Sequence, residues 1–367
     1  MVRPLASEPA RVAVIGAGII GLSCAWRLAD CGIDVTVLDA GSAGQGASFA
    51  AAGMLAPAFE AAGDGIHPAL YDFCMASNAR WPDFAARLEA ATGRSLGYQP
   101  GPSLAVGTDP SSLERLNALS EALRRRGQTV VPLTSEEAKA FEPTLSNQVQ
   151  RALQLPFDGQ IDNRAVILAL LGVCQAHQRI QLRCGVAVSD VGGLARDYDR
   201  VLISAGWRSK ALSPILQRLE PIGGQLLSVR VGEGTPRVTL RCDDLYIAPK
   251  ADRVVIGATI EPGEVREAPD PKTIDALQER AAVLCPGLGT AERIESWSGV
   301  RPGFPDHAPV MGRLGASHVF VATGHHRNGV LLAPETASLM TALMLDDDVP
   351  VWAKVFAPGR QERIRPV

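Results

Sequence analysis

Apolar residues follow two different periods within the first forty positions of the chain. The run RVAVIGAG (11–18) is rich in β-branched residues and ends in glycines, which is typical of a buried strand and the turn after it. Residues 20–32 (IGLSCAWRLADCG) carry apolar side chains at helical spacing, and DVTVLDA (34–40) again has the composition of a strand. The pattern therefore predicts a strand–helix–strand unit at the start of the chain.

The same two periods return further along the chain. Residues 163–177 have helical apolar spacing, 179–191 indicate a strand and turn, and 200–209 indicate a strand ending at Gly206. Between 222 and 260 the pattern changes to short alternating strands broken by Gly and Pro, as in an antiparallel sheet. The sequence thus predicts an α/β protein with a doubly wound layer and a second, antiparallel sheet.

Composition and charge narrow the classes of ligand. The 367 residues are 46% hydrophobic and 20% charged, enough for a large core and roughly two domains. A net charge of -3 without a basic run argues against nucleic acid or an anionic membrane as partner and favours small neutral or zwitterionic ligands. Seven cysteines without a C-x-x-C pair favour a reducing compartment, and no run reaches the ~20 apolar residues of a membrane span. We expect a cytoplasmic protein.

The first turn carries a dinucleotide fingerprint. Gly16, Gly18 and Gly21 fit G-x-G-x-x-G where a strand becomes a helix, and Asp39 ends the next strand. The glycines permit a tight turn, close approach to a pyrophosphate and close helix–strand packing, while an acid at Asp39 can accept hydrogen bonds from a ribose diol. The helix start offers unpaired N–H groups to the phosphates. We therefore expect a bound dinucleotide, NAD or FAD.

The segment after Asp39 bears on which dinucleotide binds. GSAGQGASFAAAGMLAP (41–57) is too rich in Gly and Ala to form much core, and small residues let the backbone lie close to a flat ligand. A cofactor that extends past the ribose to a flavin ring would suit this segment. The alternative interpretation is a flexible surface loop.

Several blocks of the chain resemble one known family. GAGIIGLSCAWRLA together with ASFAAAGML resembles the start of the D-amino acid oxidase superfamily, in particular the glycine oxidases of thiamine biosynthesis. Residues 246–264, 297–313 and 322–340 resemble later glycine oxidase blocks in the same order. The resemblance implies a Rossmann-like FAD-binding domain made of 1–75, 150–215 and 300–367, with an antiparallel β-sheet substrate-binding domain made of 76–149 and 216–299.

The stretch TGHHRNGVLLAP (323–334) allows three interpretations: a metal site, the base of a hydrolase, or part of a cofactor pocket. The histidines His325 and His326 are adjacent and have no other His or Cys cluster near them, which disfavours zinc, and no G-x-S-x-G serine turn occurs in the chain. The family carries G-H-[FY]-R-N-G here. The resemblance implies a loop that leads into a helix whose start points at the flavin N1 and C2 carbonyl. His326 departs from the family's Phe or Tyr.

The resemblance also implies the substrate contacts. Arg301 matches the arginine that holds the substrate carboxylate, Tyr246 matches a tyrosine that completes this clamp, and Arg327 matches a further pocket arginine. Asp244, Ile260 and Gly223 stand where relatives have other residues, and an acid at Asp244 would favour secondary or larger amines if it faced the pocket. The full set of cofactor contacts that the resemblance implies, non-covalent and to FAD, is Gly16, Gly18, Ile19, Ile20, Gly21, Asp39, Ala40, Ala47, Ser48, Ala52, Gly53, Met54, Val186, Gly206, His325, His326, Arg327, Asn328, Gly329, Val330 and Leu331.

The reaction implied by the resemblance is oxidative deamination of glycine, with sarcosine and small D-amino acids as close alternatives. Hydride leaves the α-carbon for flavin N5, water hydrolyses the imine to a 2-oxo acid (glyoxylate from glycine) and ammonia, and oxygen reoxidises the flavin with release of hydrogen peroxide. The imine would serve thiamine thiazole synthesis. Two alternatives stay open: a dehydrogenase that passes electrons to a quinone or partner subunit, and a flavin-binding protein without turnover. The sequence does not decide between a monomer and a homo-oligomer.

Overall fold

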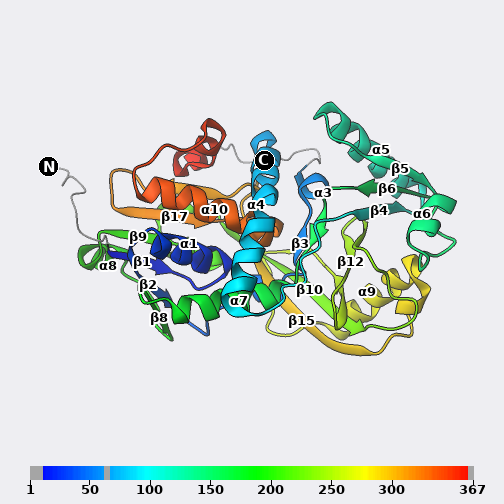
Figure 1. Cartoon of the computed structure of the whole chain (residues 1–367), viewed down its shortest axis with the longest axis horizontal. Helices are drawn as coiled ribbons and strands as arrows, with labels where there is room; N and C mark the ends of the chain where they lie inside the picture. The colour runs from blue at the N-terminus through cyan, green and yellow to red at the C-terminus, as the bar shows by residue number, and fades with distance from the viewer. Residues whose placement is uncertain (1–10, 62–66, 363–367) are drawn as a thin grey trace.

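The chain forms two lobes, each built on one large β-sheet (Figure 1). The structure is a computed structural model that describes residues 11–61 and 67–362. The long helix α4 (Pro68–Thr92) lies between the lobes in this view (Figure 1). Among the described helices, none combines the length and the apolar character needed to cross a membrane.

The first lobe contains a six-stranded sheet in the order β16-β17-β9-β1-β2-β8. Neighbouring strands are parallel except for the antiparallel pair β16 and β17. In β1, Val12 and Val14 belong to one hydrophobic core, while Ala13 and Ile15 belong to the core on the other face. Burial on both faces explains why this strand is continuously apolar rather than alternating. The strands are β1 (Arg11–Ile15), β2 (Asp34–Asp39), β8 (Ile180–Cys184), β9 (Arg200–Ile203), β16 (Val310–Arg313) and β17 (Val319–Thr323).

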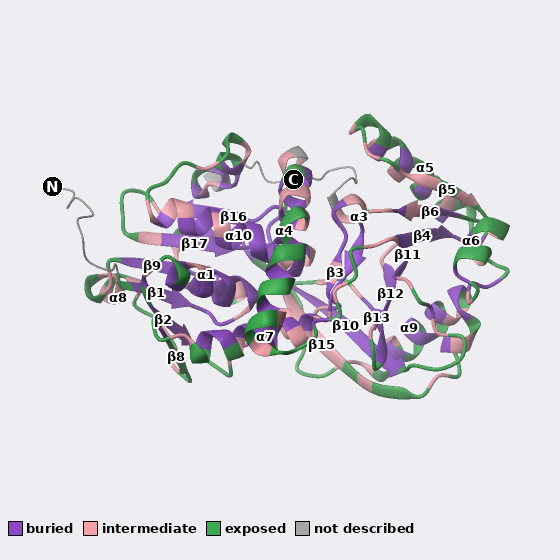
Figure 2. Ribbon diagram, in the orientation of Figure 1, coloured by how far each residue is buried: buried purple, intermediate pink, exposed green. Residues whose placement is uncertain are grey.

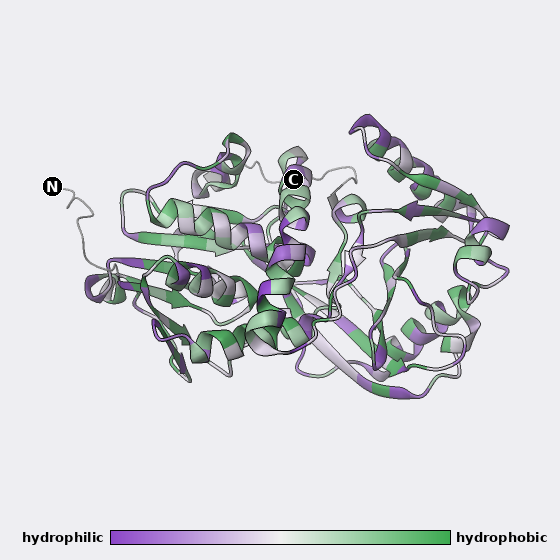
Figure 3. Cartoon of the chain, in the orientation of Figure 1, coloured by the Kyte–Doolittle hydropathy of each residue, from purple (hydrophilic) through white to green (hydrophobic). Residues whose placement is uncertain are grey.

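Helices cover one face of this sheet more heavily than the other. On one face, α1 (Ile19–Asp30) contacts α7 (Asn163–Ala176) and α10 (Gly329–Met344), and α4 contacts both α7 and α10. Most residues of α1 and α10 are buried, as expected for helices that are apolar nearly all round (Figures 2 and 3). The other face packs against α8 (Val191–Asp197), η1 (Gly206–Leu212) and η2 (Pro214–Leu216). The last two described elements are η5 (Val351–Phe356) and η6 (Pro358–Glu362).

The second lobe contains a nine-stranded sheet in the order β14-β10-β13-β12-β11-β4-β6-β5, with β15 paired to β10. Neighbours are antiparallel except for β4 beside β11. The strands are β4 (Ser103–Gly107), β5 (Val131–Thr134), β6 (Arg151–Leu155), β10 (Glu220–Arg230), β11 (Leu240–Cys242), β12 (Leu245–Pro249), β13 (Arg253–Gly257), β14 (Glu261–Pro262) and β15 (Arg293–Gly303). The helices of this lobe are α5 (Pro110–Arg125), α6 (Ser135–Phe141), α9 (Pro271–Leu284) and η3 (Pro286–Leu288).

Short elements connect the two lobes. The segment after β2 forms α2 (Ala47–Ala50), β3 (Met54–Leu55) and α3 (Pro57–Ala61), and β3 pairs with β7 (Gly159–Gln160). After β17, a single turn η4 (His326–Asn328) leads directly into α10.

The α/β fold with one mainly parallel and one mainly antiparallel sheet agrees with the sequence prediction, but two of the expected domain boundaries differ from the element order. The boundary between 75 and 76 falls inside α4, which packs on α7 and α10 of the first lobe. The segment expected to begin at 150 in the cofactor domain starts with β6, which pairs with β4 and β5 of the second lobe. The predicted strand over 200–209 ends at Ile203, and Gly206 begins η1 instead.

Candidate functional site

Five parallel strands of the first lobe end at one edge of the sheet, and the predicted cofactor residues follow those ends. Open parallel sheets bind ligands beyond their carboxyl ends. Since β1 and β17 both pair with β9, the first turn and the segment near the far end of the chain are only about 10 Å apart. Gly16, Gly18, Ile19, Ile20 and Gly21 follow β1; Asp39, Ala40, Ala47, Ser48, Ala52, Gly53 and Met54 end or follow β2; Val186 follows β8, Gly206 follows β9, and 325–331 follow β17.

The turn from β1 to α1 depends on glycine at defined positions. Gly16 has a φ of +106°, which side chains rarely adopt, and a Cβ there would lie 2.5 Å from the Ser204 carbonyl oxygen. At Gly21 a Cβ would overlap the carbonyl oxygen of Gly16, so α1 can approach β1 this closely only without a side chain. Gly18 is the N-cap of α1. The three glycines of the fingerprint therefore build a tight turn at the helix start.

Asp39 stands at the end of β2 beside this turn. Its Oδ2 accepts a hydrogen bond from the N–H of Ala17 at 2.7 Å, and its Oδ1 accepts one from Gly41 at 2.8 Å. Each carboxylate oxygen has a further lone pair, so these two bonds leave room for hydroxyl donors. The side chain thus supports the glycine turn, a role that the sequence pattern did not indicate.

Two long helices begin without a side-chain cap, and both begin at this edge. Of the six described helices with twelve or more residues, α4, α5, α7 and α9 are capped by the side chains of His67, Asp109, Asp162 and Asp270. The N-cap residues of α1 and α10, Gly18 and Asn328, make no such bond. Free N–H groups and the positive end of the helix dipole favour an anion or a developing negative charge there.

The segment 47–54 is held in place by hydrogen bonds from α1 and α7. The Ser48 hydroxyl accepts from the N–H of Ile19 at the start of α1, and the side-chain amide of Asn163 donates to the carbonyl of Ser48 at 2.8 Å. Gly53, with a φ of +71°, packs so closely on the Ile161 carbonyl that a side chain would overlap it. A fixed path replaces the flexible loop that was the alternative interpretation of this segment.

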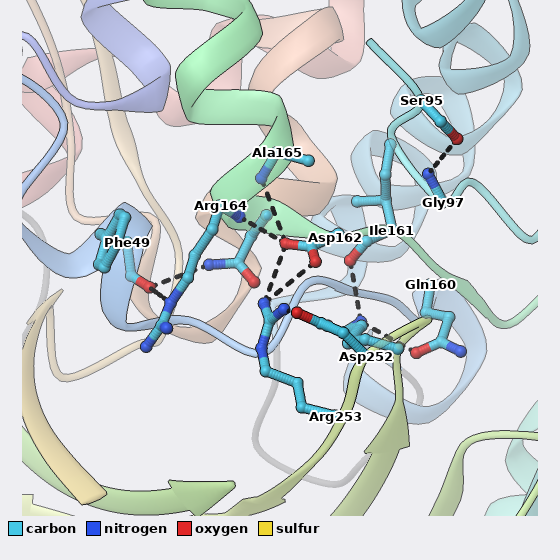
Figure 4. Close-up of polar contacts among 12 residues, drawn as sticks. Phe49, Ser95, Gly97, Gln160, Ile161, Asp162, Arg164, Ala165, Asp252 and Arg253 are labelled. Carbon is cyan, nitrogen blue, oxygen red and sulfur yellow. Dashed lines mark hydrogen bonds and ion pairs between the residues drawn. The ribbon is translucent and has the colours of Figure 1, made fainter. Parts of the chain in front are cut away.

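The start of α7 links the same segment to the second lobe (Figure 4). Asp162 caps α7 by accepting from the N–H groups of Arg164 and Ala165, and it pairs with Arg253 of β13 at 3.0 Å (Figure 4). Arg164 places its guanidinium over the Phe49 ring at 4.5 Å. A polar layer therefore connects α7, the segment around Phe49 and the second sheet.

Strand β15 reaches from the cofactor edge into the second lobe along one of its faces. The indole of Trp297 donates to the Ala50 carbonyl at 2.9 Å, and a Cβ on Gly299 would meet the Ala50 methyl group at 2.5 Å. Arg301 and Gly303 follow on the same face because side chains alternate along a strand. A Cβ on Gly303 would lie 3.3 Å from the His326 ring.

Segment 325–331 combines two neutral histidines with a helix start. Burial lowers the pKa of His325 to about 3, and its Nε2 shares a 3.1 Å hydrogen bond with the Thr336 hydroxyl. Burial, followed by the charges of His307 and Arg301, lowers the pKa of His326 to about 3. His326 has a φ of +50°, an unusual conformation for a residue with a side chain, and its ring lies 4.9 Å from that of His307.

Arg301 and Tyr246 meet over two glycines of the second sheet. Arg301 Nη1 donates to the carbonyls of Gly223 at 3.1 Å and Thr259 at 3.2 Å. A Cβ on Gly224 would collide with this guanidinium, and a Cβ on Gly257 would lie 2.6 Å from the Tyr246 hydroxyl. Burial lowers the pKa of Arg301, against the raising effects of a side-chain hydrogen bond and a charge interaction with Tyr246. Neither Arg301 nor Tyr246 pairs with a carboxylate among residues 11–61 and 67–362.

A second charged group lies nearby, centred on Glu60. Arg327 Nε approaches Glu60 Oε2 at 3.0 Å and its Nη2 donates to Oε1 at 3.2 Å, a two-pronged contact. Arg241 of β11 also pairs with Glu60 and lies over the Phe59 ring, 3.8 Å from its centroid. Burial acts to raise the pKa of Glu60, but the charges of Arg241 and Arg327 outweigh it and lower this pKa to about 2.

The structure brings Tyr246, Arg301 and Arg327 together but not Asp244. Arg301 lies two residues before Gly303 on β15, where a Cβ would lie 3.3 Å from His326, the residue before Arg327. Burial raises the pKa of Tyr246, and the charges of Arg301 and Arg327 act to lower it. Asp244 pairs instead with Arg280 of α9 at a half-exposed hairpin, so the hypothesis that this acid faces the substrate amine is not supported. Ile260 is 46% exposed and follows Thr259, whose carbonyl accepts from Arg301.

Sequence reasoning missed Glu60, Arg241, Trp297 and Asn163. Arg241 is the one charged residue between apolar neighbours in β11, and this pattern could have indicated a buried charge. Glu60 follows a run of small residues and carries no local signal, since its partner Arg241 lies 181 residues away. Asn163 and Trp297 resemble ordinary helix and strand residues until their bonds to segment 47–54 are seen.

The residues at the sheet edge fit an FAD. Main-chain donors at a glycine turn and an uncapped helix start suit a pyrophosphate, and Asp39 beside them suits a ribose. The uncapped start of α10 suits the part of a flavin that gains negative charge on reduction. Among the described residues no cluster of three or more His, Cys, Asp or Glu side chains is placed to hold a metal ion.

Comparisons with known proteins agree with this geometry. The model of a family described as FAD dependent oxidoreductase matches residues 11–343. A bifunctional protein ThiO/ThiG of Synechocystis is 34% identical over 95% of this chain, which spans 54% of that relative's length. A glycine oxidase of Pseudomonas aeruginosa is 30% identical over 95% of this chain and 98% of its own length. The crystal structure of glycine oxidase from Geobacillus kaustophilus superposes with a TM-score of 0.87 at 29% identity, covering 95% of this chain and 98% of that one.

Proposed function

Because the chain belongs to the family of FAD-dependent oxidoreductases, we propose that it oxidises glycine, with sarcosine and small D-amino acids as further substrates. Glycine, oxygen and water would give glyoxylate, ammonia and hydrogen peroxide. The glycine oxidases among the similar proteins support this substrate class. The chain spans only about half the length of the bifunctional relatives, so their names alone do not carry the proposal.

The observation that carries the proposal is an arginine that has no acidic partner among the described residues. Arg301 is held by two carbonyl oxygens beside the Tyr246 hydroxyl, whereas Arg241 and Arg327 share Glu60. A buried guanidinium without a counter-charge is costly, and a carboxylate ligand supplies that charge with well-matched geometry. The α-carboxylate of an amino acid is therefore the group that we place on Arg301.

The chain's own residues orient the substrate and provide no strong base. FAD supplies the hydride acceptor when bound. Arg301 and Tyr246 fix the carboxylate, which leaves the α-carbon and the amine at a defined position beside the segment 325–331. His325 and His326 have pKa values of about 3, so both rings are neutral near pH 7 and add no charge opposite a substrate amine. Positioning and electrostatics are thus the main contributions of the protein.

Anaerobic bleaching tests the proposed function. The purified protein is expected to be yellow, and glycine or sarcosine added without oxygen should remove its visible absorbance; readmitted oxygen should restore the colour and yield peroxide. Bleaching followed by dye reduction but little peroxide would indicate a dehydrogenase instead. Flavin that no amine bleaches would contradict the proposal and favour a binding protein without turnover.

We place the product in thiamine synthesis within the same proposal. The resemblance implies that the imine formed from glycine serves thiamine thiazole synthesis, and the similarity to the ThiO/ThiG relatives supports this assignment. A strain lacking this chain should require thiamine or its thiazole for growth. Growth without either supplement would contradict this part of the proposal.

A further inference from the structure

We infer that Glu60 determines substrate selectivity by occupying Arg327, so that the site accepts amino acids with one carboxylate and rejects those with two. The inference rests on the proposed function and deepens it, because it concerns the class of amino acid that the site takes. Arg241 and Arg327 share the carboxylate of Glu60, while the neighbouring Arg301 has no acidic partner among the described residues. A site so rich in positive charge would by itself favour dicarboxylates.

The Glu60–Arg327 contact has the shape of a substrate contact. Both oxygens of Glu60 face the Nε and Nη2 edge of Arg327, at 3.0 and 3.2 Å. This edge is the one with which an arginine grips a planar carboxylate most specifically. Glu60 is therefore an internal carboxylate in the place where a second substrate carboxylate would bind.

Glu60 is held firmly in this position. The carboxylate of Asp158 accepts hydrogen bonds from the N–H groups of Ala58 at 2.8 Å and Phe59 at 2.9 Å, which fixes the start of α3. The Phe59 ring lies against Arg241, and Arg241 in turn pairs with Glu60. The side chain of Glu60 is only 10% exposed. A ligand would have to displace a buried, doubly paired carboxylate to reach the fork of Arg327.

The Glu60–Arg327 pair can affect substrate selectivity because it lies close to the proposed site of the substrate carboxylate. A Cβ on Gly303 would lie 3.3 Å from the ring of His326, the residue before Arg327, and Arg301 stands two residues before Gly303 on the same face of β15. The Glu60–Arg327 pair therefore lies near the arginine that we assign to the α-carboxylate, and the charges of both residues act on the pKa of Arg301. Arg327 is 21% exposed and Arg301 has no acidic partner among the described residues. A second carboxylate on the ligand would meet the negative charge of Glu60 in a poorly solvated site, where like charges repel strongly.

Equilibrium binding to the purified flavin-loaded protein tests the inference without any need for turnover. Acetate, malonate and succinate are titrated, and the change in flavin absorbance gives each Kd. The wild-type protein should bind acetate at least as tightly as malonate or succinate, despite its three arginines. Dicarboxylates that bind tenfold more tightly than acetate to the wild-type protein would overturn the inference.

The variant Glu60→Gln provides a second test of the inference. It keeps one acceptor for the arginines but removes the charge, so the ratio of malonate to acetate affinity should shift by about tenfold or more towards malonate. The kcat/KM for iminodiacetate relative to glycine should shift in the same direction. Glu295→Gln is the matched control, since it removes one charge from another Arg–Glu pair, with Arg164, and should leave the affinity ratio within about threefold of wild type.

The outcomes separate this inference from the proposed function. An unchanged affinity ratio in Glu60→Gln overturns the inference even if glycine bleaches the flavin normally. A wild-type protein that no amine bleaches contradicts the proposed function, and the two Kd series still decide whether Glu60 excludes a second carboxylate. If Glu60→Gln does not retain flavin, the Kd values of the wild-type protein alone test the inference. Dicarboxylates that bind the wild-type protein tenfold more tightly than acetate would still overturn it.

Discussion

The two sides of the candidate site differ in the kind of group that they offer to a ligand. On the side of the six-stranded sheet, the contacts expected for the cofactor come from glycine turns and helix starts that lack side-chain caps. On the side of the nine-stranded sheet, the groups that we assign to the substrate are charged or hydroxyl-bearing side chains from β12, β15, α3 and η4. The first side thus offers mainly backbone groups, and the second offers mainly side chains. A substitution on the first side must therefore change backbone packing, whereas one on the second can change charge alone.

The largest effect on flavin binding and stability is expected when a side chain is introduced into the glycine turn of the first side. Gly21→Ala places a methyl group on the Gly16 carbonyl oxygen, so α1 must move away from β1. We expect loss of bound flavin and a drop of about 3 kcal/mol or more in the free energy of unfolding. Flavin-to-protein ratio and thermal unfolding measure both effects. Gly172→Ala, a helix glycine with room for a methyl group, is the control and should retain flavin.

The second largest effect, on kcat/KM, is expected for a side chain of the second side and should leave flavin content unchanged. Arg301→Ala removes the guanidinium assigned to the substrate carboxylate, so kcat/KM should fall by about a hundredfold, mainly through KM. Steady-state kinetics with glycine and an absorbance spectrum of the purified variant test this. If flavin is lost instead, Arg301 belongs to the cofactor side and the contrast between the two sides fails at this residue.

A smaller effect is expected for Asp39, which supports the glycine turn and which we assign to the ribose of the cofactor. Asp39→Asn removes one of the two oxygens that accept from Ala17 and Gly41, and it removes the charge offered to a ribose diol. Flavin affinity should weaken by about tenfold, with turnover at saturating flavin little changed. Titration of the flavin-free protein with FAD provides the Kd. Equal affinity in the variant would show that the main chain alone recognises the cofactor.

The smallest effect concerns the support of Glu60 and its dependence on pH. Burial raises the pKa of Asp158 to about 7, although the N–H groups of Ala58 and Phe59 act to lower it. A carboxyl group whose folded pKa is raised binds its proton more tightly in the folded state. The stability it contributes is present at low pH and is lost as pH rises from about 4 through 7.

Asp158→Asn should flatten this part of the profile. The Tm difference between pH 6 and pH 8 should become smaller than in the wild-type protein, by about 2 °C or more. Differential scanning calorimetry at the two pH values measures it, with Asp190→Asn, an exposed helix cap, as the control. An unchanged difference would show that Asp158 does not titrate in this range.

The contrast between the two sides also explains what the sequence could predict. The turn at Gly16 to Gly21 and the acid at Asp39 lie within one strand–helix–strand unit, so local spacing sufficed to find them. The family resemblance indicated Tyr246, Arg301 and Arg327, and the structure brings these three together. Which residues each of them contacts could not be derived locally, because the strands that carry them pair with partners far away in the chain.

Two misplaced expectations have the same physical origin. Asp244, two positions before Tyr246, stands where relatives have another residue, and an acid there was expected to favour secondary or larger amines if it faced the pocket. The strand begins only at Leu245, and the hairpin turns Asp244 towards Arg280 instead. Likewise β6 lies just after the expected boundary at 150, but its backbone pairs with β4 and β5. Hairpin geometry and strand pairing decided both cases, and neither is visible in hydrophobic periodicity.

Strand β15 works as a fixed spacer between the two sides. Trp297 secures the segment around Ala50 and Arg301 stands four residues further on, about 13 Å away along an extended backbone. Inserting or deleting one residue between them would turn the arginine to the opposite face. The distance from the segment around Ala50 to Arg301 can thus change only by insertion or deletion of two residues at a time. A larger site would have to arise through changes in the surrounding loops rather than in this strand.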